Sequence, residues 1–169
     1  MDNIAEFLEE LARFKRYSTP FSVVTFKLVF LNKNEEINYF NTVLFNLRLF
    51  FEKHKRKLDI LDRYKSLIVM GLRETPVDKV KGFLDRFYNT LDSYLKDYIL
   101  QSRAGKDEVK IVDVKLNIYL VSLEAKNIDN IILISEVSEN GFISVLENIN
   151  SLEEKIFEVW KVSFPIIEE

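Results

Sequence analysis

Side chains able to do chemistry are sparse in this sequence. It has no cysteine, which excludes thiol catalysis, disulfides and thiolate zinc sites. His54 is the only histidine, so no multi-histidine metal site can form, and we expect a solvated or capping residue near a helix end. The carboxylates available to an enzyme, such as Asp59, Asp62 and Glu74, are scattered and form no motif. The residues alone therefore predict no catalytic constellation.

Phosphate-binding and stacking motifs are equally scarce. The four glycines form neither a P-loop nor a dinucleotide-binding string. An aromatic group on one predicted helix could form a base-stacking platform, but its helical spacing favours packing in the core and at its rim. Its members are Phe87, Tyr88, Tyr94 and Tyr98. A basic cluster at 53–57 is either solvated or meets an anionic ligand or partner.

Composition bounds the class of protein. The 169 residues suffice for one domain, and 47% hydrophobic with 30% charged residues is a globular balance. A net charge of −3 gives no overall field for nucleic acid or anionic lipid, and no apolar run reaches the roughly 20 residues that cross a bilayer. No signal-peptide pattern is present, so we expect a cytoplasmic protein. Abundant Lys, Glu, Ile and Phe with one Gln hint at a thermophile.

Hydrophobic periodicity predicts the elements of the first two thirds of the chain. Residues 4–17, 35–55 and a segment starting after Pro76 have helical spacing. Residues 21–31 are nearly continuous in apolar character, which is typical of a strand buried on both faces. Residues 58–64 and 66–72 predict two strands joined by a tight turn at 63–66. After a polar loop at 101–108, residues 109–123 alternate as a strand does.

The last third is ambiguous. Residues 129–137 fit either a helix ended by Asn140 and Gly141 or a strand of a hairpin that turns there. A final helix is predicted from the spacing of Leu146, Ile149, Leu152, Ile156 and Trp160. We expect Pro165 to end the regular structure. This order of elements predicts an α+β fold in which a mostly antiparallel central sheet is flanked by helices.

Several strings of the sequence, taken in order, resemble a GGDEF (diguanylate cyclase) domain. Residues 7–28, FLEELARFKRYSTPFSVVTFKL, are similar to the first helix and strand of that family. Residues 58–76, LDILDRYKSLIVMGLRETP, resemble the hairpin that carries the signature, and VKGFLDRFYNTL and VKLNIYLVSL follow in the expected order. The resemblance covers residues 5–123 of a single domain, 1–169, whose C-terminal third diverges. It implies a nucleotide-cyclase or ferredoxin-like fold.

The departures from the family concern its chemistry. The metal-binding Asp that the family has at the end of its first strand falls on Lys27, and a cation there repels Mg²⁺. Lys65 and Ser66 replace the signature glycines, and the acidic pair that should follow is missing. The guanine-reading side chains are absent too. We therefore expect a degenerate GGDEF domain without diguanylate cyclase activity, catalytic residues, metal or cofactor.

One pattern of the family persists. Arg56 and Asp59 keep the R-x-x-D spacing before the hairpin, and the resemblance implies that they bind cyclic di-GMP as in the family's inhibitory site. Ordinary roles explain the same residues, since Arg56 complements a helix C-terminus and Asp59 caps a turn. Both interpretations stay open here.

Three functions follow as hypotheses. The first is a non-catalytic regulatory or scaffold domain acting through protein–protein contacts, with a protein partner or a homodimer, because 14 Phe, 7 Tyr and 1 Trp leave material for an apolar interface. The alternative is a cyclic di-GMP receptor that uses Arg56 and Asp59. The third is a nucleotide-processing enzyme of unknown chemistry. No nucleic-acid partner or membrane insertion is expected.

Overall fold

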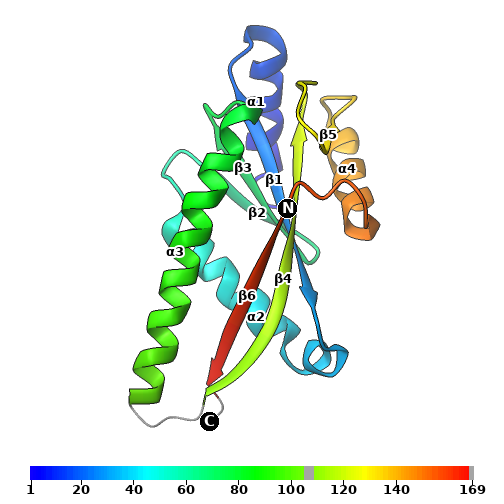
Figure 1. Cartoon of the computed structure of the whole chain (residues 1–169). Helices are drawn as coiled ribbons and strands as arrows, with labels where there is room; N and C mark the ends of the chain where they lie inside the picture. Colours follow the sequence, from blue (N-terminus) through cyan, green and yellow to red (C-terminus); the bar gives the residue numbers. More distant parts are fainter. Residues whose placement is uncertain (105–108, 168–169) are drawn as a thin grey trace.

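The computed structural model describes residues 1–104 and 109–167 (Figure 1). Within them the chain forms four helices and six strands. The helices are α1 (Ile4–Tyr17), α2 (Lys33–His54), α3 (Val77–Ala104) and α4 (Glu139–Ser151). The strands are β1 (Phe21–Phe30), β2 (Ile60–Tyr64), β3 (Leu67–Arg73), β4 (Val109–Ser122), β5 (Ile131–Leu133) and β6 (Glu158–Ile167).

All six strands join one sheet. Its order is β2-β3-β1-β4-β5, and β6 also pairs with β4. The 14-residue β4 pairs with β1 along one edge and with two strands along the other, where residues 109–118 pair with β6 and residues 120–122 with β5. Only the β4–β5 pairing is parallel among the pairs described. The predicted fold class, a ferredoxin-like α+β domain with a mostly antiparallel sheet, is confirmed.

Helices cover both faces of the sheet. Because side chains alternate along a strand, Val24, Phe26 and Leu28 of β1 face α2 and α3, whereas Phe21 and Val23 face α1 and α4. Figure 1 shows α3 running beside the long β4–β6 ribbon, with α4 on the far side of β4. The central strand β1 is therefore buried on both faces for most of its length, as its continuous apolar run predicts.

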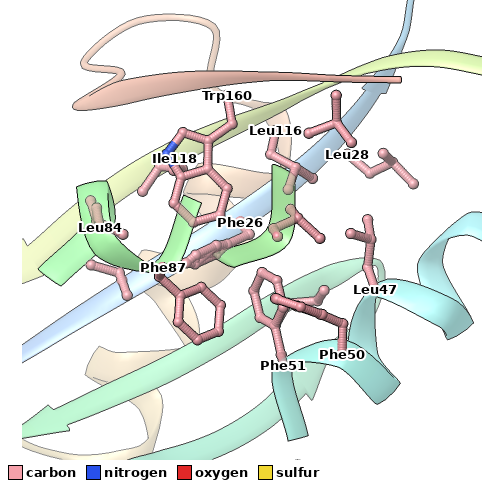
Figure 2. Close-up of a cluster of buried hydrophobic side chains, with 14 of the residues drawn as sticks. Phe26, Leu28, Leu47, Phe50, Phe51, Leu84, Phe87, Leu116, Ile118 and Trp160 are labelled. Carbon is pink, nitrogen blue, oxygen red and sulfur yellow. The ribbon is translucent and has the colours of Figure 1, made fainter. Parts of the chain in front are cut away.

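Aromatic side chains fill the core beneath α2 and α3 (Figure 2). The ring of Phe51 lies edge-on to Phe26 at 4.7 Å and to Phe87 at 5.1 Å between centroids. Trp160 of β6 packs on Phe26 at 5.3 Å and is 2% exposed. Aromatic rings bury large apolar areas in these offset and edge-on arrangements, so this cluster fixes α2 and α3 on the sheet.

The elements expected over residues 4–100 are confirmed to within a few residues. One difference is that α3 continues through Ala104, where a loop from residue 101 was expected. The remainder of that loop, residues 105–108, lies outside the described residues. None of the helices in the described part of the chain is both long enough and apolar enough to span a membrane.

The expectation for residues 129–141 was wrong about the role of Gly141. This glycine opens α4 instead of ending a helix or turning a hairpin, and its N–H donates to the Ser138 hydroxyl that caps the helix, at 3.0 Å. The carbonyl of Glu136 lies so close that a Cβ at position 141 would collide with it. Glycine is needed here for that close backbone approach. The preceding segment contains only the short strand β5.

The predicted final helix is confirmed for Leu146 and Ile149, which lie in α4, but it was wrong for its end, because residues 158–167 form strand β6. Its alternate residues Trp160, Val162, Phe164 and Ile166 are buried against α2 and α3, a period of two that the spacing of Leu146 to Trp160 concealed. Pro165 lies within this strand and does not end it. The strand pairs only with β4 among the described strands, so it is an edge strand, where a residue without an N–H is tolerated.

Two glycine substitutions test this packing. Gly71→Ala in β3 should lower the free energy of unfolding by about 1–3 kcal/mol through overpacking, because the new Cβ would lie 2.8 Å from Phe21 Cζ and 2.9 Å from Phe7 Cε1. Gly82→Ala, on the exposed side of α3, should raise it by up to about 1 kcal/mol, since alanine favours helix. Urea denaturation measures both, and equal effects would contradict the described core.

Candidate functional site

Lys27 lies in the middle of the sheet, and its ammonium group binds the end of a helix. The side chain leaves β1 towards α4, where Nζ donates to the carbonyl oxygens of Leu152 at 3.0 Å and Ile149 at 3.4 Å. These carbonyls belong to the C-terminus of α4, where the helix dipole is negative and carbonyls lack helical partners. The ammonium group at the expected metal position therefore caps a helix.

A second anchor holds the same helix end. The buried Tyr119 hydroxyl donates to the Leu152 carbonyl at 2.7 Å, so this oxygen accepts from two strands at once. Burial, and to a smaller extent Glu153, raises the pKa of Tyr119 above its usual range, which keeps the hydroxyl protonated and donating. Apolar burial adds to this anchor, since Phe142, Leu146 and Ile149 of α4 are fully buried against the sheet.

The turn between β2 and β3, where the resemblance expects the signature, also contacts α4. Lys65 holds a left-handed conformation with φ 51°, which glycine would adopt more easily. Its Nζ donates to Glu147 Oε1 at 2.8 Å, and the Tyr64 hydroxyl donates to the other oxygen of the same carboxylate. The pKa of Glu147 is lowered by these hydrogen bonds, first from Lys65 and then from Tyr64. Ser66 completes the turn and is partly buried.

The structure thus brings Lys27 and the Lys65 turn onto one helix. Both positions where the resemblance expects cyclase chemistry contact α4, from a part of the chain where that resemblance ends. Within residues 1–104 and 109–167, no three His, Asp or Glu side chains gather closely enough to hold a metal ion. In this arrangement, Lys27 and the Lys65 turn position helix α4.

Arg56 and Asp59 lie together, but each is occupied by the other. Arg56 Nη2 and Nε donate to Asp59 Oδ1 and Oδ2 at 2.7 and 2.9 Å, and the Asp59 side chain is fully buried. Arg56 Nη2 also donates to the Thr75 hydroxyl at 2.9 Å, and the guanidinium lies over the face of the Phe83 ring. A guanine edge would have to displace Asp59 from this fork. The arrangement supports the structural interpretation, and cyclic di-GMP binding stays a prediction.

The other candidate carboxylates do not converge. Asp62 accepts from the backbone N–H of Asn3 at 2.8 Å and so ties the start of α1 to β2. Glu74 lies in the turn before α3 with φ 57°. Asp59 is the buried partner of Arg56. These three groups have separate roles, which gives no support to an enzyme built on them.

A groove between α2 and α3 was not predicted from the sequence. Its volume is about 320 Å³, and residues 164–166 of β6 line it together with the two helices. Its walls include Asn46, Phe50, Lys53 and His54 of α2 and Tyr94 and Tyr98 of α3. His54 was expected to be solvated or capping, but its ring packs 4.3 Å from Phe50 and its Nε2 is buried. Of the aromatic group weighed for stacking, Phe87 lies in the core and Tyr94 at the rim.

Replacing Lys27 tests the capping role. Lys27→Met keeps the stem but loses both hydrogen bonds, and should cost about 1–3 kcal/mol of stability. Lys27→Asp should cost more, because a carboxylate would face the negative end of α4. Lys115→Met, on the same face of the neighbouring strand, is the control and should change stability by less than about 0.5 kcal/mol. Thermal and urea unfolding measure these effects, and a Lys27→Asp variant as stable as the wild type would contradict the cap.

Substitutions of Arg56 distinguish a structural role of this residue from a role in ligand binding. Arg56→Ala should destabilise the protein by about 3 kcal/mol because it strands the buried Asp59 carboxylate, whereas Lys57→Ala at the exposed neighbouring position should be nearly neutral. Calorimetric titration with cyclic di-GMP checks the alternative. Heat of binding that vanishes in a folded Arg56→Lys variant, which retains the charge but not the fork, would support a ligand role.

Comparison with known proteins adds no relative. No protein-family model matches the chain, no curated protein is similar to it, and no solved structure matches it. The GGDEF resemblance of residues 5–123 therefore stays a prediction.

Proposed function

We propose that this chain is a non-catalytic, GGDEF-like regulatory or scaffold domain that acts through protein–protein contacts, with a second copy of itself as the simplest partner. The observation that carries the proposal is that α2 is apolar on two sides. Its inner side buries Val43, Leu47 and Phe51 in the core. Its outer side exposes large apolar side chains, namely Ile37 at 83%, Phe45 at 59% and Leu49 at 54%.

The outer side of α2 has the spacing of an interface. Phe45 and Leu49 are four residues apart and so lie on the same side of the helix, with Ile37 about two turns before Phe45. Large apolar side chains that are exposed together on a surface mark sites of interaction with a partner. Arg48 and Glu52 flank this row, and a second copy facing it would offer opposite charges to both. We call the row formed by Ile37, Phe45 and Leu49 the outer row of α2.

The non-catalytic part of the proposal rests on the contacts of Lys27. An ammonium group stands where the resemblance expects a metal carboxylate, and it is held against the carbonyls that end α4. Diguanylate cyclases need carboxylates there to hold Mg²⁺ against the triphosphate. The fold is retained while this position caps a helix, which is the pattern expected when binding replaces catalysis. A cytoplasmic location is part of the same proposal.

Phe45→Glu tests the outer row. Wild-type protein should self-associate as its concentration rises in sedimentation equilibrium, and the variant should remain monomeric, because a carboxylate would be desolvated at the interface. Stability should change by less than about 0.5 kcal/mol, since Phe45 is mostly exposed.

Tyr17→Glu is the matched control. Tyr17 is an aromatic residue of similar exposure, 68%, but it lies on α1. This variant should associate as the wild type does. Wild-type protein that stays monomeric at every concentration, with no co-purifying partner, would contradict the proposal, as would equal effects of the two substitutions.

A further inference from the structure

The groove between α2 and α3 differs in charge from the rest of the protein. The chain carries a net charge of −3, yet the described residues that line the groove include the cation Lys53 and no carboxylate. Lys53 forms no ion pair with any acidic side chain of the described residues. An anion entering the groove would therefore meet an uncompensated ammonium group and no repelling carboxylate on the walls.

The walls of the groove are aromatic. The rings of Phe50 and His54 lie 4.3 Å apart, and Tyr94 lies 5.6 Å from Phe50 and 6.2 Å from His54. Tyr94 is 44% exposed although it contacts both rings, so part of its surface remains open to the groove. Planar ligands gain most from such surfaces, because ring faces and edges stack in offset arrangements. The volume of about 320 Å³ suits a ligand of one or two fused rings.

His54 presents a polar atom without a partner. Its Nε2 is buried and forms no hydrogen bond with any described residue. A buried polar group left unpaired is costly, and most such groups in folded proteins find a partner. Burial, and then the neighbouring Lys53, lower the pKa of His54, so the ring is neutral near pH 7 and retains one donor and one acceptor nitrogen. Because this nitrogen is shielded from solvent, a ligand oxygen in the groove would satisfy it after a small rotation of the imidazole ring.

We infer that the α2–α3 groove binds a planar aromatic carboxylate. The ring stacks among Phe50, His54 and Tyr94, the carboxylate pairs with Lys53, and one of its oxygens accepts a hydrogen bond from the buried nitrogen of His54. Asn46 also lines the groove, and one N–H of its side-chain amide donates to the Thr42 carbonyl at 2.9 Å. The groove does not include Lys27, Arg56 or Phe45, although Leu49 of the outer row of α2 also lines it.

The probe for this site is 1-naphthoate. His54 is the only histidine, so its ring protons give a single set of imidazole signals in the NMR spectrum and report on the groove without assignment. Titration with 1-naphthoate should shift these signals with a Kd of about 0.1–1 mM, the affinity typical of a small rigid ligand. Cyclohexanecarboxylate and 1-naphthalenemethanol, which lack the aromatic ring and the charge respectively, should each bind about tenfold more weakly.

Three variants assign the contacts by calorimetry. Lys53→Met and His54→Phe should each weaken 1-naphthoate binding about tenfold, through loss of a charge-assisted and a buried hydrogen bond. Lys57→Met, which removes an exposed lysine outside the groove, should bind as the wild type does. His54→Phe should also keep or raise the thermal stability, because it removes a buried nitrogen that has no partner among the described residues.

Each other outcome overturns the inference. If the His54 signals do not move at the highest soluble concentration of 1-naphthoate, the groove does not take this class of ligand. Equal binding of the neutral alcohol, or unchanged binding in Lys53→Met, would show that charge plays no part. Should His54→Phe be too unstable to test, His54→Gln serves in its place, and a wild-type affinity in that folded variant would reject the role of the imidazole.

Discussion

The structure depends on a strand that is buried on both faces and yet contains a lysine. β1 pairs with β3 and β4 and lies beneath two helices on each side, so a charge in its middle needs partners from the layers above. The carbonyls at the end of α4 provide them, 122 and 125 residues further along the chain. The contact fixes where α4 ends, and the Tyr119 hydroxyl and the Lys65–Glu147 pair hold the same helix. A position resembling a metal site in sequence thus organises the α1–α4 layer.

This arrangement divides the molecule by role. On the α1–α4 side, Lys27 donates to the carbonyls that end α4, and Lys65 pairs with Glu147 of the same helix. On the α2–α3 side, large apolar side chains are exposed along α2, and a groove without carboxylates contains a buried nitrogen that lacks a partner among the described residues. Polar groups with hydrogen-bond partners stabilise a fold. Polar groups without partners and exposed apolar side chains are instead available to ligands and to partner proteins. The exposed row and the groove therefore lie on the side of the sheet opposite Lys27 and the Lys65 turn.

Most of the fold could be predicted from the sequence, because hydrophobic periodicity and the residues that end helices and strands indicate the same elements over residues 4–100. Pro76 directly precedes α3, and the 63–66 turn joins β2 and β3. Prediction failed where two periods overlap. Leu146 to Trp160 fit a helical stripe, while Trp160 to Ile166 alternate with a period of two, and only pairing with β4 decides in favour of the strand. The ion pair between Arg56 and Asp59 could have been predicted, because the two residues are only three positions apart in the sequence. The partners of Lys27 and the burial of His54 could not have been predicted, because both depend on contacts between segments that are distant in the sequence.

His54 is one of four described residues with a buried side-chain polar atom that has no partner, together with Thr25, Glu158 and Trp160. Elsewhere in the described chain, charged side chains in confined places have partners, as Asp59 has Arg56 and Glu10 has Arg73. A phenylalanine at position 54 would continue the aromatic packing of Phe50 and Tyr94 without burying a nitrogen, so stability alone does not account for a histidine there. Positions that break the rules met by the rest of a sequence are those where function is expected to set the residue. The lysine one residue before it, unpaired among the described residues, makes the same groove the place where an anion would be recognised.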